Sequence, residues 1–483
     1  MYDVKMLINN VDVAAQGNKT YDRYNPVTNE VAARAAAASV GDVQAAIEAA
    51  AKAFPAWSVL GPNERRAKLL RAADLLEERT GEAVARMMDE TGTTTPWGEF
   101  NAHFAASMIR EAASMTTQIT GEVIPSDKAG CFAMAVRQPV GVCVGMAPWN
   151  APIILGVRAV AMPLACGNTV VLKASETCPA THRLIGEVMR DAGLPAGVLN
   201  VVTNDLADAP QIVNALIEHP AVKRVNFTGS SRVGRIVAEI AAKHLKRVLL
   251  ELGGKAPLVV LADAYVDGAV NAAAFGAFMN QGEICMSTER IVIDESIADE
   301  FVKKLAAKAA TLPAGDPRTG TVALGSLVTP EAAARIAGLV KDAVSKGAKL
   351  VTGGEVKGTI MNATVLDQVT PAMKLYYEES FGPIACVVRV RGAEEAIRVA
   401  NDTEFGLAAA VFGRDIKRTL DVALRIESGI CHINGPTVND EAQMPFGGVK
   451  DSGYGRFGGK PAIDEFTNVR WITIEDSGQG YPF

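Results

Sequence analysis

From residue 140 onward, short apolar runs alternate with segments of helical periodicity. The first four runs are residues 140–147, 168–172, 197–202 and 222–227. Between two of them, residues 180–192 place their apolar side chains on one helical face. Strands separated by helices of this length form parallel βαβ units, because a parallel pair needs a long crossover connection.

The same alternation returns in the second half of the chain. Strands are predicted at residues 257–261, 290–293, 384–390 and 407–412, and helices at 298–310 and 331–346. A chain of 483 residues also exceeds the size at which one hydrophobic core stops growing. We therefore expect an α/β protein with two doubly wound lobes that face each other across a cleft.

The first third of the chain, after a polar start, is predicted to be mostly helical. Helices are expected at residues 42–54, 63–78 and 97–118, followed by a pair of strands within residues 121–137.

Composition excludes several classes of function. The net charge of -6 gives no broad basic surface, so neither nucleic acid nor an anionic membrane is an expected partner. The N-terminus lacks the apolar core of a signal peptide, and no later run approaches the length of a membrane span. We therefore expect a cytoplasmic protein whose partner is a small molecule.

Cysteine and histidine usage also limits the chemistry. The seven cysteines are scattered without a C-x-x-C pair, and the five histidines form no H-E-x-x-H motif. These patterns argue against a disulfide framework and against a metal site.

Cys285 lies in a segment, residues 275–290, that favours an accessible thiol. It closely follows Gly282 and precedes a polar Ser-Thr-Glu-Arg run, after an apolar stretch that favours burial. The pattern fits a nucleophile. The alternative is a buried cysteine that acts as a small apolar side chain, which is the more common role for a lone cysteine.

Two motifs at strand ends suit a nucleotide. In Phe227-Thr228-Gly229-Ser230, a strand turns into a helix whose first N–H groups could bind a phosphate, although a plain turn would look the same. Lys173 and Glu176 follow another strand, where both could bind ribose hydroxyls; the alternative is a solvated surface pair. A carboxylate at this place disfavours a 2′-phosphate and so favours NAD over NADP.

Three further polar residues have a catalytic and a plain interpretation. Asn150 ends a strand, where its amide could stabilise an oxyanion or cap the following helix. Glu251 stands in an apolar run that would raise its pKa towards that of a usable base; the alternative is a buried glutamate paired with a nearby lysine. Glu379 belongs to an acidic turn that could be no more than that.

Together, these motifs resemble those of the aldehyde dehydrogenase superfamily over essentially the whole chain. PWN, K-x-x-E, FTGS, ELGGK, the cysteine segment, EESFGP and PFGG occur in the order of that family. The resemblance implies that Cys285 is the nucleophile and Glu251 the general base. Asn150 would donate to the oxyanion together with the backbone N–H of Cys285.

The resemblance also implies a cofactor, NAD, with NADP less favoured. The contacts to its adenosine half and pyrophosphate would be Lys173, Glu176, Gly229 and Ser230. Glu379 would hold the nicotinamide ribose, and Phe381 would pack beside the nicotinamide ring. No metal is implied.

A closer resemblance is to the bacterial aromatic branch of the family, the vanillin and salicylaldehyde dehydrogenases. It rests on MPLACGNTVVLK, NQGxICMSTERIV, HINGPTV, EAQMPFGGVKxSGYGRFGG and the terminal YPF. It implies vanillin as the first candidate substrate, and salicylaldehyde or related hydroxybenzaldehydes next. The implied pocket residues, for which ordinary packing is the alternative, are Trp97, Ala151, Arg158, Ile284, Met286, Val438 and Phe446. Arg158 would meet a ring hydroxyl or methoxy oxygen.

One residue departs from the family pattern. The usual G-Q-x-C is here Gly282-Glu283-Ile284-Cys285. A carboxylate two residues from the thiol would raise the thiol pKa if both faced the same side. We therefore predict that Glu283 points away from Cys285 or is paired.

The resemblance further implies a domain division and an assembly. Residues 1–118 and 141–252 would form the NAD-binding domain, 253–450 the catalytic domain, and 119–140 with 451–483 a small β oligomerisation element of a homodimer or homotetramer. Alternatives are a dehydrogenase for another aldehyde or semialdehyde, an enzyme that passes the thioester to coenzyme A, a cofactor-independent cysteine hydrolase and a non-catalytic scaffold.

Overall fold

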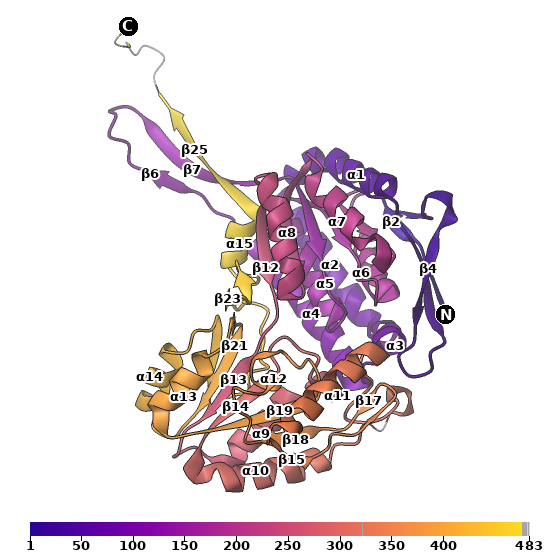
Figure 1. Ribbon diagram of the computed structural model, residues 1–483. Coiled ribbons are helices and arrows are strands. Elements are labelled where there is room, and N and C mark those ends of the chain that lie inside the picture. Colours follow the sequence, from indigo (N-terminus) through magenta and orange to yellow (C-terminus); the bar gives the residue numbers. More distant parts are fainter. Residues whose placement is uncertain (321, 476–480, 482) are drawn as a thin grey trace.

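The structure is a computed structural model that describes residues 1–320, 322–475, 481 and 483. It has two α/β lobes and a projecting arm (Figure 1). In the described ranges, no helix is both long enough and apolar enough to cross a lipid bilayer.

The first lobe is built on an eight-stranded sheet with the order β24-β12-β11-β8-β9-β10-β2-β3. Its five central strands are parallel: β12 (Arg247–Glu251), β11 (Val222–Thr228), β8 (Val142–Met146), β9 (Thr169–Lys173) and β10 (Leu199–Val202). Antiparallel neighbours flank them: β24 (Gly453–Tyr454) on one side and the β2–β3 pair (Met6–Ile8 and Val11–Val13) on the other.

Helices cover both faces of this sheet because side chains of successive residues in a strand point to opposite faces. One face, which includes Val144 and Val171, packs on α1 (Val40–Ser58), α7 (Ala209–Glu218) and α8 (Ser231–Lys243). The other, which includes Cys143 and Val170, packs on α5 (Pro152–Ala165) and α6 (Pro179–Asp191), with α2 (Pro62–Glu78), α3 (Thr80–Thr91) and α4 (Thr95–Met115) in the same core. The strands are therefore continuous apolar runs, as the sequence predicts.

The second lobe repeats this plan. Its seven-stranded sheet has the order β15-β18-β19-β14-β13-β21-β22. The strands are β15 (Lys349–Thr352), β18 (Thr364–Asp367), β19 (Ile384–Val390), β14 (Thr288–Asp294), β13 (Ala256–Val260), β21 (Ala408–Phe412) and β22 (Ile430–Ile433), and only β15 runs antiparallel to its neighbour. One face packs on α9 (Val266–Phe278) and α10 (Glu295–Ala310). The other packs on α11 (Pro330–Ser345), α12 (Lys374–Tyr377), α13 (Gly392–Asn401) and α14 (Ile416–Leu424).

The N-terminal region differs from the prediction. Residues 2–36 contain five strands, of which β1 (Tyr2–Val4), β5 (Val31–Ala36) and β4 (Thr20–Tyr24) form a separate sheet. Helix α3 was also not predicted. Strands β1, β2 and β3 have three residues each, and β5 reads VAARAA, in which only Val31 is β-branched, so the sequence does not mark them as strands. Helices α1, α2 and α4 lie where the periodicity predicts them.

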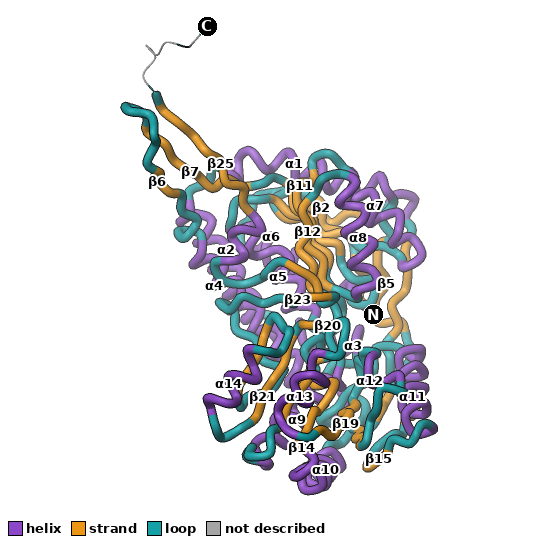
Figure 2. The backbone as a smooth tube through the Cα atoms, turned by 60° about the vertical axis from the view of Figure 1, so that its left-hand side comes forward, coloured by secondary structure: helices purple, strands orange, loops and turns teal. Residues whose placement is uncertain are grey.

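The arm is a three-stranded sheet of β6 (Glu122–Ile124), β7 (Phe132–Pro139) and β25 (Thr467–Ile474), which extends away from both lobes (Figures 1 and 2). Only β25 of the expected segment 451–483 belongs to it. Strand β24 pairs with β12 in the first lobe, and α15 (Pro461–Phe466) contacts α5. Residues 476–480 and 482 of that segment lie outside the described residues.

The first lobe contributes residues from the carboxyl ends of its strands, and the second lobe contributes residues from the amino ends of its strands. Asn150, Gly229 and Glu251 stand at the carboxyl ends of β8, β11 and β12, and the strand order reverses between β8 and β11, which is where open α/β sheets bind ligands. The second lobe contributes residues that precede its strands: Cys285 before β14 and Glu379 before β19.

Candidate active site

Cys285 stands where two cavities meet. The larger has a volume of about 260 Å³ and the smaller about 220 Å³, and Cys285 and Asn150 line both. The cysteine is partly exposed, in contrast to the buried Cys143 and Cys166. The residue is therefore accessible, as the sequence pattern predicts, and it borders both cavities.

The loop before Cys285 has an unusual backbone. Asn280, Gln281 and Gly282 have φ values of 47°, 53° and 72°, so three successive residues lie in the left-handed region. At Gly282 this is compatible only with glycine, because a Cβ there would come within 2.1 Å of the carbonyl oxygen of Gly382. Such a conformation persists only where surrounding contacts fix it.

Buried polar side chains supply those contacts. The Oε1 of Gln281 accepts the N–H of Gly325 at 2.8 Å, and its Nε2 donates to the carbonyl of Ser326 at 3.2 Å. The Oδ1 of Asn280 accepts the hydroxyl of Thr93 at 3.0 Å. The nucleophile loop is therefore tied to both lobes.

Glu283 belongs to the same anchoring set. Its Oε1 accepts the N–H of Val328 at 3.0 Å, and burial raises its pKa well above the usual value, although that hydrogen bond opposes the shift. The prediction that Glu283 is paired is confirmed. The Glu283 carboxyl group is thus engaged with the backbone of Val328 rather than with the thiol of Cys285.

Asn150 is held by three neighbouring groups. Its Nδ2 donates to the carbonyl of Glu283 at 3.1 Å, while its own carbonyl accepts Trp97 Nε1 and Asn280 Nδ2, both at 3.1 Å. Helix α5 has Ala151 as its N-cap, without a side-chain hydrogen bond, so Asn150 does not cap it. Among the described residues, the second amide N–H of Asn150 has no acceptor and can donate to a ligand. The backbone N–H of Cys285 likewise has no acceptor among the residues that the structure describes.

Glu251 is 1% exposed, and neither of its carboxyl oxygens has a hydrogen-bond partner within the described part of the chain. Burial raises its pKa to about 7, against the positive charge of Arg158. Lys255, the lysine nearest in sequence, pairs instead with Glu289 at 2.7 Å. The lysine-paired alternative for Glu251 is therefore wrong.

Glu251 and Cys285 influence each other's protonation. Burial, and next the negative charge of Glu251, raise the pKa of the Cys285 thiol well above its usual value. The resting thiol therefore carries its proton at neutral pH, where a carboxyl group with a pKa of about 7 can accept it.

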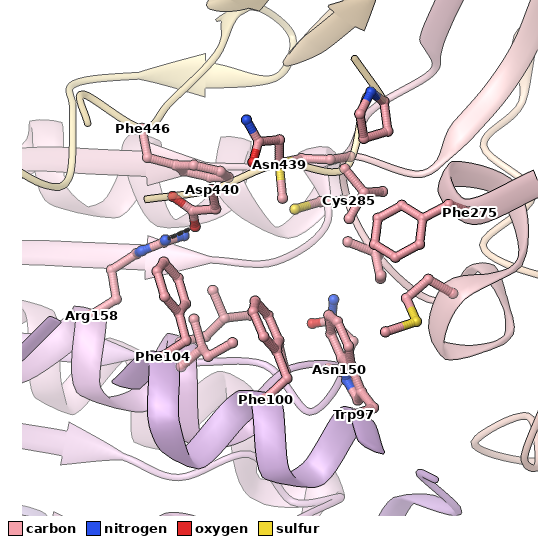
Figure 3. Close-up of a pocket in the computed structure, with 18 residues that line it drawn as sticks. Trp97, Phe100, Phe104, Asn150, Arg158, Phe275, Cys285, Asn439, Asp440 and Phe446 are labelled. Carbon is pink, nitrogen blue, oxygen red and sulfur yellow. Dashed lines mark hydrogen bonds and ion pairs between the residues drawn. The ribbon is translucent and has the colours of Figure 1, made fainter. Parts of the chain in front are cut away.

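The larger cavity is mainly apolar and aromatic (Figure 3). All seven residues expected around the aldehyde line it: Trp97, Ala151, Arg158, Ile284, Met286, Val438 and Phe446. Sequence reasoning missed Phe100, Phe104 and Phe275. On α4, Trp97 stacks on Phe100 and Phe100 on Phe104, each with ring centroids 5.4 Å apart. Trp97, Phe100 and Phe104 are three and four residues apart on a predicted helix, and this spacing could have identified the two phenylalanines.

A buried ion pair interrupts the apolar lining. Arg158 Nη2 contacts Asp440 Oδ2, with side chains that are 4% and 9% exposed, and the guanidinium carbon lies 4.1 Å from the centre of the Phe446 ring (Figure 3). Burial raises the pKa of Asp440, and Arg158 opposes that shift. Nothing in the sequence marked Asp440, because it is distant from Arg158 along the chain.

The smaller cavity gathers four of the six residues expected at the cofactor: Gly229, Ser230, Glu379 and Phe381. Trp149 and Phe381 meet edge to face at 5.7 Å. Ser230 caps α8 by accepting the N–H of Val233 at 3.4 Å. Glu379 Oε1 accepts the N–H of Gly254 at 2.8 Å, and burial, with the charge of Glu289, raises the pKa of Glu379 to about 8.

The other two, Lys173 and Glu176, lie at the carboxyl end of β9. Lys173 Nζ contacts Glu176 Oε1 at 2.6 Å, and Asn204 Nδ2 donates to the same oxygen at 3.0 Å. Burial alone would raise the pKa of Glu176, but the charge and hydrogen bond of Lys173 bring it below the usual value. Both side chains are largely buried, so the pair is not a solvated one. Among the described residues, no three His, Cys, Asp or Glu side chains are arranged to hold a metal.

Comparisons with known proteins show the family of the chain. The model of the "Aldehyde dehydrogenase family" matches residues 13–472. Vanillin dehydrogenase of Pseudomonas fluorescens is 60% identical over 482 residues, which cover 100% of both chains. Salicylaldehyde dehydrogenase of Pseudomonas putida is 52% identical over 480 residues, 99% of each chain.

A solved structure gives the same result for the fold. The crystal structure of a salicylaldehyde dehydrogenase from Pseudomonas putida G7, complexed with salicylaldehyde, matches with a TM-score of 0.98 and 51% identity, covering 100% of both chains. The predicted fold class is confirmed. With the family model, the full-length relatives and this structure in agreement, the chain belongs to the aldehyde dehydrogenase family and is an oxidoreductase that acts on aldehydes.

Proposed function

We propose that this protein oxidises an aromatic aldehyde to the carboxylic acid with NAD. Vanillin is the first candidate substrate, and salicylaldehyde or a related hydroxybenzaldehyde the next. The observation that carries the proposal is the position of Cys285 between an aromatic-lined cavity and a second cavity bordered by Gly229, Ser230 and Glu379. Relatives named vanillin and salicylaldehyde dehydrogenase support the choice of substrates.

Catalysis begins with the thiol of Cys285. Glu251, whose pKa is about 7, accepts the thiol proton, and the thiolate attacks the aldehyde carbon. The resulting oxyanion accepts hydrogen bonds from the free N–H of Asn150 and the backbone N–H of Cys285. Both donors are fixed in place before the reaction, Asn150 by Glu283, Trp97 and Asn280.

The chemistry that bound NAD would supply is the acceptance of a hydride from the substrate carbon. The carbonyl then reforms as a thioester on Cys285, which must be hydrolysed. Glu251 first releases the thiol proton to solvent and then, again as a carboxylate, takes a proton from water. Its buried oxygens, which have no partner among the described residues, suit a group that hydrogen-bonds solvent in the reaction.

The residues of the second cavity fit a dinucleotide. The N-terminus of α8, with Gly229 and Ser230 before it, suits the pyrophosphate, since N–H groups and helix dipole both favour an anion there. Glu379 would hold the nicotinamide ribose and Phe381 would lie beside the nicotinamide ring. Lys173 and Glu176 would bind the adenosine ribose, and the ionised Glu176 favours NAD over NADP.

The aromatic cavity would receive the substrate ring. Trp97, Ala151, Ile284, Met286, Val438 and Phe446 would enclose it. Arg158 is engaged by Asp440, so we propose that the pair, rather than Arg158 alone, meets a ring hydroxyl or methoxy oxygen.

The test is a panel of specificity constants for NADH formation. We expect vanillin, salicylaldehyde and benzaldehyde to exceed acetaldehyde and hexanal in kcat/KM, and Cys285→Ala to abolish turnover with every aldehyde. A higher kcat/KM for the aliphatic aldehydes would contradict the aromatic assignment, and turnover in Cys285→Ala would contradict the mechanism.

We further propose the domain roles and a homo-oligomer. Residues 1–118 and 141–252 would bind NAD, 253–450 would carry catalysis, and 119–140 with 451–483 would include the oligomer contact.

The arm exposes a set of apolar side chains that a second copy would cover: Val123, Phe132, Val469, Trp471 and Ile474. Light scattering should give a dimer or tetramer that Trp471→Glu dissociates; a monomeric wild-type protein would contradict this. We also propose that the protein works in the cytoplasm.

A further inference from the structure

A buried ion pair lies behind the active site without lining either of its cavities. Lys255 Nζ contacts Glu289 Oε2 at 2.7 Å, and the two side chains are 0% and 3% exposed. Neither residue was assigned a role in catalysis or binding. A buried pair of this kind is weak evidence for stability, because desolvation offsets the attraction between the charges. Its contacts indicate another role.

Glu289 holds one turn of the second lobe. Its Oε1 accepts the N–H and the hydroxyl of Ser380, both at 2.9 Å, and the N–H of Phe381 at 3.0 Å. Phe381 has a φ of 47°, a backbone conformation that residues other than glycine rarely adopt. Because a carboxylate only accepts hydrogen bonds and has two oxygens to do so, it can satisfy these three donors and Lys255 together.

The same turn is held from the side of Lys255. Gly254, the residue before Lys255, donates its N–H to Glu379 Oε1 at 2.8 Å. Glu379 and Phe381 thus lie on either side of Ser380, the residue that Glu289 binds through both its backbone and its side chain. Glu289 therefore binds Ser380 and Phe381 directly, and Glu379 is held by the backbone of the residue that precedes Lys255.

The pair also connects the catalytic segments. Lys255 follows the segment that begins with Glu251, and Glu289 lies on β14, directly after the loop of Cys285. One buried contact therefore joins the segment of the proposed base, the segment of the nucleophile and the turn that carries Glu379.

We infer that Lys255 and Glu289 are positioning residues that hold Glu379 and Phe381 in place for the nicotinamide half of the cofactor. The inference rests on the proposed role of Glu379 at the nicotinamide ribose. It predicts that breaking the pair weakens binding of the nicotinamide half and leaves the adenosine half unaffected.

The test uses calorimetric titration of the full-length protein with two probes. NAD contains the nicotinamide ribose, whereas AMP contains only the adenosine part. In Glu289→Gln we expect the Kd for NAD to rise at least about tenfold, the size expected when charge-assisted hydrogen bonds are lost, with the Kd for AMP unchanged. KM for NAD should rise similarly, and KM for the aldehyde should not.

A matched control separates positioning from a general loss of stability. Asp367 is buried in the same lobe and pairs with Arg389 at 2.7 Å, away from both cavities. Asp367→Asn should lower the melting temperature without changing the Kd for NAD or AMP. If Glu289→Gln does not fold, the double variant Lys255→Met/Glu289→Gln replaces it, because removing both charges leaves no unpaired ion in the interior.

The variant Glu379→Gln separates a failure of the positioning inference from a failure of the proposed role of Glu379. If it weakens NAD binding and neither variant of Glu289 does so, the positioning inference is overturned and the proposed function stands. If Glu379→Gln itself leaves NAD binding unchanged, the proposed role of Glu379 fails, and the inference fails with it.

Discussion

The rate of thioester hydrolysis should follow the ionisation of Glu251. This carboxyl group is 1% exposed, and burial raises its pKa to about 7, with Arg158 opposing the shift. Only the ionised form can accept a proton from water, and that form predominates above the pKa. Lowering the pH through 7 should therefore slow the reaction.

The size of the effect follows from the pKa. A group with a pKa of about 7 is about 10% ionised at pH 6 and about 90% ionised at pH 8. Where hydrolysis limits turnover, kcat should therefore rise about tenfold between these pH values. Replacing Arg158 with Met should move the step to higher pH, because the opposing positive charge is removed.

Rapid-mixing measurements of NADH formation from vanillin separate the two halves of the reaction. Acylation gives an initial burst, and hydrolysis gives the later steady rate. In Glu251→Gln, whose amide cannot accept the thiol proton, we expect a slower burst that still reaches one NADH per site. We expect the steady rate that follows to be about 10²–10⁴-fold lower and to show no step near pH 7.

Glu283→Gln is the matched control, since it removes another buried carboxyl group from the same site and should keep the step. The reasoning is refuted if Glu251→Gln retains the step, or if its steady rate falls less than about tenfold.

Three further changes test other parts of the site. Asn150→Ala should lower kcat about 10²–10³-fold, equivalent to about 2.7–4 kcal/mol for one oxyanion donor, with little change in KM for the aldehyde; an unchanged kcat in steady-state assays would exclude the role. Glu176→Ser removes the carboxylate that disfavours a 2′-phosphate, so the ratio of kcat/KM for NADP to that for NAD should rise about tenfold, and a constant ratio would argue against Glu176 as the discriminating group. Glu283→Gln should leave the pH dependence of Cys285 alkylation by iodoacetamide unchanged, because Glu283 is paired with Val328; a large shift to lower pH would show that its charge does reach the thiol.

Much of the fold could be predicted because both sheets are buried on their two faces. Strands such as β8 and β9 are then continuous apolar runs between amphipathic helices, which is a strong signal. The short N-terminal strands gave no such signal. Strand β5 is rich in alanine, and β4 has no alternation of apolar side chains, so neither strand is marked by its own residues although the two pair with each other.

Some residues of the site could be predicted from local motifs, and others could not. Cys285, Asn150 and Glu251 belong to local motifs, and the structure brings them together. Asp440 and Glu289 belong to no recognisable local motif. Each pairs with a charged residue that is distant in the sequence, Asp440 with Arg158 and Glu289 with Lys255. The left-handed backbone at Asn280 and Gln281 could not be predicted either, because it depends on hydrogen bonds to residues distant in the sequence, Thr93 and Gly325.

The most direct test of the mechanism is to trap the acyl group on the enzyme. Glu251→Gln is mixed with vanillin and NAD, quenched in acid, digested and analysed by mass spectrometry. A vanilloyl group is expected on the peptide that contains Cys285, in an amount that matches the NADH burst, and on none of the other six cysteines. A burst of NADH without an acyl group on Cys285, or an acyl group on a different residue, would contradict the proposed mechanism.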